Sequence, residues 1–300
     1  RGASDMKGAL AAALFAVRVL RENRVPLNGN LMIQSVIGEE QGEAGTRTCV
    51  EQGYRTDFAI VPEPTNLTIA GQGGVITGWI VIRSPETLHD ALRARTIHAG
   101  GGIAGANAIE KMVKVIEALQ ELERHWAVVK QYPGFPPGST TINPAVIEGG
   151  RHPAFMADAC ALWITVHFYP NETYSQVARE VEEHVLRAAA ADPWLRDHPP
   201  TFAWGGRSMI EDRGEIFPAG PLDSGFPGTQ ALADAHRAVT GHEPALAMGP
   251  SVSDAGWLST AGMPTVLYGP GTLEQAHAVD ESIPVVDLVM AARVFAELIV

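Results

Sequence analysis

The sequence predicts an α/β protein in which a smaller α+β unit is inserted into a larger unit built on an open, mainly parallel sheet. Strand-like apolar runs alternate with helical patterns at both ends of the chain, while the middle follows the order β-α-β-β-α-β. The length of 300 residues exceeds the usual size of one domain and favours two. We place the larger unit at residues 1–75 and 222–300 and the insert at residues 76–221.

The larger unit is predicted from short apolar runs that alternate with helices. Residues 7–22 are rich in Ala and Leu, which favours a helix, and residues 31–37 form an apolar run before Gly38 that favours a buried strand. The further elements are a helix over 44–52, strands over 57–61 and 264–268, and a last helix over 285–300. Strands separated by helices are typical of a parallel sheet, because parallel neighbours need long crossover connections.

The insert is predicted from two different periods. Residues 159–168 place an apolar side chain at every second position, as a strand with one buried face requires. Residues 105–125 form an amphipathic helix whose apolar stripe is predicted to serve core or dimer packing, namely Ile109, Met112, Val113, Ile116 and Leu119. Strands over 74–82, 140–147 and 201–204 and a helix over 173–191 complete the ferredoxin-like order.

Composition limits the classes of partner. Hydrophobic residues make up 46% of the chain and the net charge is −12, so a core is expected and no nucleic acid or anionic membrane surface is expected as the main partner. No apolar run approaches the roughly 18 residues of a membrane helix. Cys49 and Cys160 are the only cysteines, which favours a reducing, cytoplasmic location over a disulfide framework.

Acidic side chains and one histidine follow the predicted strands of the larger unit. Glu39 and Glu40 follow one strand, Glu63 follows the next, His277 lies in the loop after a third, and Asp5 precedes the first helix. Ligands of open α/β sheets bind beyond the carboxyl ends of the strands. Carboxylates gathered there would repel each other unless a cation neutralised them. Carboxylate and imidazole ligands suit zinc, manganese or cobalt, so the pattern favours a dinuclear metal site.

Each of these residues also has an ordinary interpretation. Asp5 could cap the helix that follows it, and the adjacent glutamates could be a solvated helix start. Glu63 could be a surface turn residue before Pro64, and His277 an exposed loop histidine. Their joint occurrence at strand ends favours the metal site.

Five segments spread over essentially the whole chain form a set in a fixed order: RGASDMKG at 1–8, GEEQGEAGT at 38–46, PEPT at 62–65, TIHAGGGIAGANAIEKM at 96–112 and GPGTLEQAHAVDE at 269–281. The set resembles the motifs of the acetylornithine deacetylase and succinyl-diaminopimelate desuccinylase family, the M20-type metallopeptidases and deacylases. This resemblance implies a zinc-exopeptidase-like α/β catalytic domain with an inserted ferredoxin-like dimerisation (lid) domain.

The resemblance also implies residue roles. The implied metal ligands are Asp5, which bridges two divalent ions, and Glu40, Glu63 and His277. Glu39 takes the place of the general base. His98 takes the place of the histidine that reaches into the site of the partner subunit, with His89 as a nearby alternative, so a homodimer is expected.

The chain departs from the family pattern in three places. The family's His-x-Asp motif would lie upstream of Arg1, so we expect an N-terminally truncated chain that binds about one metal ion tightly at most and hydrolyses its substrate poorly. In VHFYPNE, His167 stands where many members carry an arginine that binds a substrate carboxylate, and Ala154 replaces a common asparagine. Asn143 is predicted to contact substrate. These departures affect the choice of acyl group and amine more than the reaction.

The predicted function is therefore metal-dependent hydrolysis of the amide bond of an N-acyl amino acid, with two divalent ions, zinc first and cobalt or manganese as alternatives. Two other functions stay open. A dipeptidase or carboxypeptidase of the same fold would share the metal and base residues. A non-catalytic homologue, acting as a binding protein or dimer scaffold, is argued against by Glu39 and favoured by the absence of His-x-Asp.

Overall fold

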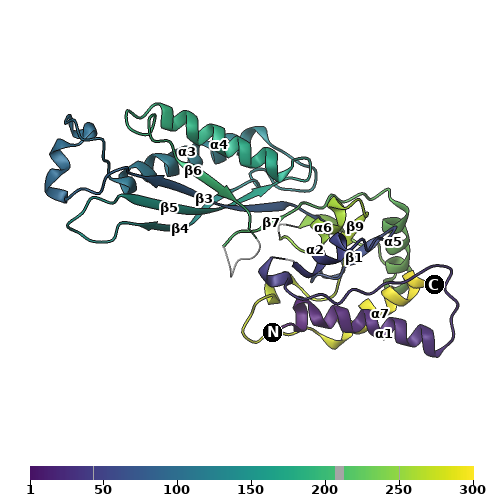
Figure 1. The fold of residues 1–300 in the computed structure, drawn as a ribbon. Coiled ribbons are helices and arrows are strands. Elements are labelled where there is room, and N and C mark those ends of the chain that lie inside the picture. The colour runs from purple at the N-terminus through teal and green to yellow at the C-terminus, as the bar shows by residue number, and fades with distance from the viewer. Residues whose placement is uncertain (43, 207–212, 250) are drawn as a thin grey trace. The chain divides into compact units, whose positions relative to one another are not determined.

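A computed structural model describes residues 1–42, 44–206, 213–249 and 251–300 (Figure 1). The chain divides into two compact units. Arg1–Gly73 and Phe217–Val300 form the first, here called the outer unit, and Gly74–Ile216 form the second, here called the inserted unit. The sequence predicts an insert at residues 76–221, which begins two residues and ends five residues later than this unit.

The outer unit contains a four-stranded sheet in the order β1-β9-β2-β8. Its strands are β1 (Ala59–Val61), β2 (Ile69–Gln72), β8 (Leu246–Gly249) and β9 (Thr265–Leu267). β1 pairs with β9 and β2 with β8 in parallel, and the central pair β2 and β9 is antiparallel. The sheet is therefore mainly parallel, as predicted.

Helices α1 (Gly8–Glu22), α5 (Pro227–Thr240) and α7 (Val285–Ile299) pack together beside this sheet. The buried face of α1 carries Ala9, Ala12 and Ala16, and small side chains at this helical spacing let α7 approach closely. Tyr268 and Phe295 fill the adjacent core. The shorter helices α2 (Ala44–Glu51) and α6 (Ala255–Thr260) contact each other.

The prediction of a strand over residues 31–37 is wrong. The structure assigns this run no strand, and Ile37 is 86% exposed. An apolar run forms a strand only where a neighbour accepts and donates its backbone hydrogen bonds. In the part of the chain that the structure describes, no strand pairs with this run, so its apolar composition alone does not make it part of the sheet.

The inserted unit has the predicted ferredoxin-like order. Its antiparallel sheet runs β4-β5-β3-β6, and β7 (Ile216–Phe217) also pairs with β3. The four main strands are β3 (Gly74–Arg83), β4 (Ile142–Gly149), β5 (Ala159–Phe168) and β6 (Thr201–Trp204). Helices α3 (Ala108–Val129) and α4 (Tyr174–Ala190) pack side by side on one face of this sheet (Figure 1). Alternate residues of β5 face these helices, as its period of two predicts.

The buried face of α3 differs from the predicted stripe. Its buried apolar positions follow a spacing of three and four: Met112, Val115, Leu119, Leu122 and Trp126. Ile109 and Val113 are exposed, because they lie on the flank of this seam.

α3 is 22 residues long, but its outer face is charged. Among the described helices, none is both long and apolar enough to cross a bilayer.

Candidate metal centre

The structure brings three of the predicted ligands together. Nε2 of His277 lies 2.7 Å from Oε2 of Glu40 and 3.5 Å from Oδ2 of Asp5. One potential ligand atom of each residue lies within 4.8 Å of the others. These side chains come from segments separated by tens to hundreds of residues in the sequence. Two carboxylates and an imidazole form a donor set that suits a divalent transition metal.

The local backbone explains how these side chains are presented. Gly38 has a φ of 82°, which glycine adopts readily, and it turns the chain into the short 3₁₀ helix Glu39–Gln41. Asp5 lies in the turn Ala3–Lys7, which leads directly into α1. His277 has a φ of 62°, a region that residues other than glycine rarely occupy and that is enriched at functional sites.

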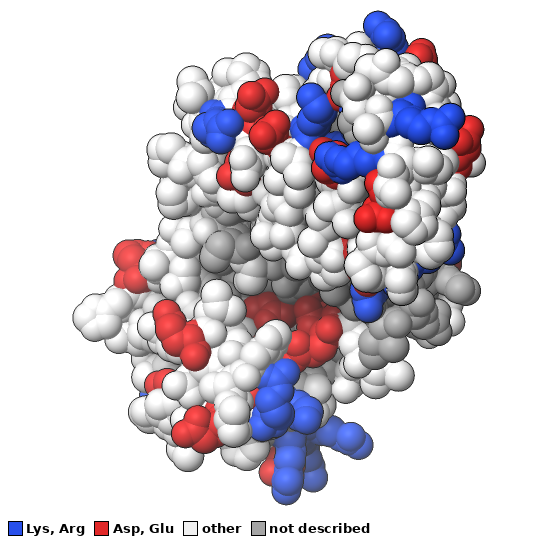
Figure 2. All heavy atoms as spheres, turned by 90° about the vertical axis from the view of Figure 1, so that its left-hand side faces the viewer, with Lys and Arg blue, Asp and Glu red and all other residues white. Residues whose placement is uncertain are grey.

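Glu63, the fourth predicted ligand, lies within electrostatic range of this cluster. Burial raises its pKa well above the ordinary value, and the charges of Glu39 and Asp5 raise it further. Burial and the charge of Glu40 likewise raise the pKa of Asp5, against a smaller opposite effect of His277. Figure 2 shows one face of the molecule, on which acidic side chains (red) gather in one patch beside a group of basic side chains (blue). Like charges held this close are unfavourable, and a divalent cation would offset their repulsion.

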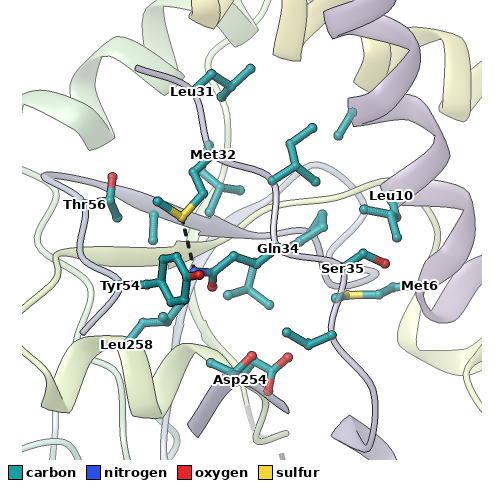
Figure 3. A pocket seen from close by; sticks show the side chains of 18 of the residues that line it. Met6, Leu10, Leu31, Met32, Gln34, Ser35, Tyr54, Thr56, Asp254 and Leu258 are labelled. Atoms are coloured by element: carbon teal, nitrogen blue, oxygen red, sulfur yellow. Dashed lines mark hydrogen bonds between the residues drawn. The ribbon is translucent and has the colours of Figure 1, made fainter. Parts of the chain in front are cut away.

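A cavity of about 770 Å³ in the outer unit is lined by Asp5, Glu39, Glu40 and Glu63 together with apolar side chains. Figure 3 shows its apolar part, where Met6, Met32 and Leu258 line the wall and Asp254 lies near them. The amide of Gln34 donates a hydrogen bond to the sulfur of Met32 at 3.3 Å. Apolar walls with a few polar groups are typical of small-molecule sites.

Two acidic residues that the sequence did not single out belong to this region. Asp254 is only 4% exposed, its Oδ1 has no hydrogen-bond partner among the described residues, and burial raises its pKa to about 6. It lies between β8 and α6, and its charge contributes to the raised pKa of Glu63. Glu281 is a buried carboxylate whose pKa is lowered to about 2, chiefly by the N–H of Asp5.

The candidate residues of the inserted unit are placed by strand register. His167 on β5 pairs with Val75, and Asn143 on β4 pairs with Thr165. His167 and Thr165 are two residues apart, so His167 and Asn143 lie on the same sheet face, opposite α3 and α4. Asn143 is exposed, and burial lowers the pKa of His167, which keeps its imidazole neutral.

The predicted catalytic histidine, His98, lies in the short 3₁₀ helix Ile97–Ala99, but its side chain falls outside the described residues. The alternative, His89, has a local structural role. Its Nδ1 accepts a hydrogen bond from the N–H of Ala91 and so caps the helix Asp90–Arg95.

Comparison with known proteins places the chain in a family. The model of the family described as peptidase family M20/M25/M40 matches residues 1–300. The N-formyl-4-amino-5-aminomethyl-2-methylpyrimidine deformylase of Halalkalibacterium halodurans is 58% identical over 293 residues, covering 98% of this chain and 69% of the relative. The protein of the same name from Bacillus subtilis is 57% identical over 300 residues, covering 100% and 70%. The acetylornithine deacetylase of Myxococcus xanthus is only 28% identical, covering 99% and 70%, so the resemblance to that enzyme is distant.

Solved structures share the fold. The aminopeptidase PepT of Bacillus cereus has a TM-score of 0.70 at 21% identity and covers 98% of this chain and 69% of its own. The YXEP protein of Bacillus subtilis, a dinuclear metal-binding peptidase of the M20 family, has a TM-score of 0.65 at 18% identity, covering 97% and 70%. The chain thus spans about 70% of the length of these proteins. With a family match over its whole length and relatives 57–58% identical, this chain belongs to the M20/M25/M40 peptidase family of hydrolases.

Proposed function

We propose that the protein is a metal-dependent amide hydrolase that removes a formyl group from an aminomethylpyrimidine. The observation that carries this proposal is the convergence of Asp5, Glu40 and His277 within 4.8 Å in a chain of a hydrolase family. The formyl substrate is taken from the names of the relatives that are 57–58% identical. Water adds to the formyl carbon, the C–N bond breaks, and formate and a free amine are released.

The residues present would supply three ligands to one divalent metal ion and two to a second, so the first would be the more tightly held, and zinc is the first choice. Glu40 and His277 would hold one ion, Glu63 the other, and Asp5 would bridge both. Bound ions of this kind lower the pKa of water and polarise the amide carbonyl. The short distances from His277 to Asp5 and Glu40, and the mutual repulsion of the three carboxylates, support this assignment.

Glu39 is the proposed general base. It neighbours the ligand Glu40, lines the same cavity and lies close enough to Glu63 to raise its pKa. Its carboxylate would take a proton from the attacking water and deliver it to the amine nitrogen as the C–N bond breaks. The base is thereby restored, and the second proton of the water leaves with the formic acid, which ionises to formate and protonates the free amine.

The identity of residue 167 favours a substrate without a carboxylate. Amino acid substrates present a carboxylate, and many family members hold an arginine for it where this chain has His167. Burial lowers the pKa of His167, so its neutral ring matches a heteroaromatic amine better than an anion. Asn143, on the same sheet face, would add a hydrogen bond to the substrate. Hydrolysis of an N-acyl amino acid is the second candidate, supported by the motif set that this chain shares with the acetylornithine deacetylases.

A substrate panel tests this choice. We expect kcat/KM for N-formyl-4-amino-5-aminomethyl-2-methylpyrimidine to exceed that for N-acetylornithine by roughly 100-fold or more, because a carboxylate left without a partner is costly to desolvate. His167→Arg should narrow this ratio, whereas the same substitution at the exposed His152 should leave it unchanged. A preference for N-acetylornithine in the unaltered enzyme would favour the second candidate.

We further propose a homodimer formed through the inserted unit, with His98 of one subunit donating a hydrogen bond to the developing oxyanion in the site of the other. Mixing inactive His98→Ala subunits with inactive Glu39→Gln subunits should restore about a quarter of the wild-type activity. Half of the randomly paired dimers are hybrids, and each hybrid has one complete site. Failure to regain activity after subunit exchange, verified by mass spectrometry, would contradict the role across subunits.

A further inference from the structure

Glu281 links the two segments that carry Asp5 and His277. Its side chain is fully buried. Oε1 accepts hydrogen bonds from the N–H groups of Ser4 and Asp5, both at 2.7 Å, and Oε2 accepts one from the N–H of Gly2 at 2.8 Å. One carboxylate therefore holds three backbone groups of the turn that presents Asp5. Hydrogen bonds to a charged acceptor are among the stronger ones in proteins.

The other end of this link leads to His277. Residues 275–282 form a closed loop, because the side-chain oxygen of Gln275 accepts a hydrogen bond from the N–H of Ser282 at 3.2 Å. The N–H of Ala278 also donates to the carbonyl of Gln275 at 3.2 Å. His277 is thus part of a closed loop that Glu281 anchors to the turn Ala3–Lys7.

A second, weaker bond joins the same segments. The hydroxyl of Ser4 donates to the carbonyl of Thr272 at 3.3 Å, without involving the Asp5 amide. The oxygens of Glu281 already face backbone donors, so this carboxylate is placed to support the ligands and is poorly placed to be one. The guanidinium of Arg1 lies 3.0 Å from the carboxylate of Glu40 and 3.8 Å from that of Glu281. Its positive charge therefore connects Glu40, the third proposed ligand, with Glu281.

We propose that Glu281 is a positioning residue of the metal centre: it fixes the backbone of Asp5 against the loop of His277, so that the two ligand side chains meet. This inference rests on the proposed metal centre. A ligand held by such a partner loses little conformational freedom when a metal ion binds, and replacing partners of this kind typically weakens metal affinity 10–100-fold. The same backbone bonds also stabilise the fold, so the test must separate stability from affinity.

The test compares Glu281→Gln with the wild type in competition for Zn²⁺ against a chelator of known affinity. Glutamine keeps the shape of the side chain, but its NH₂ group would face a backbone N–H. We expect a 10–100-fold loss of zinc affinity and an altered visible absorption of the Co²⁺-loaded protein, because the coordination geometry changes. Asp280→Asn, at the exposed neighbour, and Ser4→Ala, which removes only the second bond, should both keep the wild-type affinity within about threefold.

The outcomes separate the two proposals. A wild-type protein that binds no zinc would overturn the metal centre itself. Zinc binding that is equally tight in the wild type and in a folded Glu281→Gln variant, with an unchanged Co²⁺ spectrum, would overturn the positioning role alone. If circular dichroism shows that Glu281→Gln does not fold, Glu281→Asp decides, since it keeps the charge but withdraws it by one methylene. Wild-type affinity in that variant would also overturn the role.

Discussion

Replacing Glu39 with glutamine is expected to lower kcat by about 10²–10⁴-fold while the metal content stays at the wild-type level. The amide of glutamine cannot accept the proton of the attacking water. The three proposed ligands that converge are Asp5, Glu40 and His277, so replacing Glu39 should leave them in place. Steady-state kinetics, together with metal analysis of the same sample, measures both quantities.

Replacing the adjacent residue, Glu40, is expected to lower the metal content, unlike the replacement of Glu39. Oε2 of Glu40 lies 2.7 Å from Nε2 of His277, so Glu40→Gln should lose metal as well as activity. Glu51→Gln, which breaks only an exposed contact with Arg47 on α2, serves as the neutral control. A near-normal rate in Glu39→Gln, or loss of its metal, would show that Glu39 is not the base.

The inserted unit could be predicted almost completely, because its sequence pattern has few interpretations. The alternation of apolar residues along β5 fixes which side chains face the helices, and a shift by one residue would expose all of them. The helix α3 was located correctly, but its buried face was not. Ile109 and Val113 are apolar and exposed, and composition alone does not show which of several apolar rows meets the sheet.

The outer sheet was harder to predict. β2 and β8 are four residues long and read IAGQ and LAMG, too short and too rich in small residues to show a period. The run at residues 31–37 has a better strand composition than either, yet it forms no strand in the structure. Strand formation depends on a pairing neighbour, which lies elsewhere in the sequence.

The same limit applies to the site. The motifs indicated Asp5, Glu40 and His277, and the structure brings these three together, although their role as ligands remains a prediction. The sequence does not distinguish Glu281 and Asp254 from other acidic residues, because burial and hydrogen bonding are what set them apart. A carboxylate that accepts three backbone N–H groups cannot be distinguished by sequence from an exposed one.

Away from the site, a buried ion pair holds the inserted unit together. Nζ of Lys111 on α3 lies 2.9 Å from each carboxylate oxygen of Asp192, and the two side chains are 7% and 3% exposed. Oδ1 of Asp192 also accepts the N–H groups of Trp194 and Leu195, both at 2.9 Å. Burial alone would raise the pKa of Asp192, but the hydrogen bonds from Leu195 and Lys111 outweigh it and lower the pKa to about 2.

Lys111→Met should destabilise the protein by about 3–5 kcal/mol, because it leaves a buried carboxylate without its counter-charge. Urea unfolding at pH 7, followed by tryptophan fluorescence, measures this loss. Lys114→Met is the matched control. Lys114 lies 3.5 Å from the same carboxylate but is 53% exposed, so its removal should cost less than about 1 kcal/mol.

The effect of Lys111→Met should also depend on pH in one direction. The folded pKa of Asp192, about 2, lies below its ordinary value of 3.8, so its charge stabilises the fold above about pH 4 and this contribution is lost as the pH falls toward 2. A shift of this size corresponds to about 2 kcal/mol. The stability difference between the wild type and Lys111→Met should therefore shrink between pH 4 and pH 2. A difference that stays constant over this range would mean that Lys111 stabilises α3 by packing its methylene chain, and that its charge contributes little.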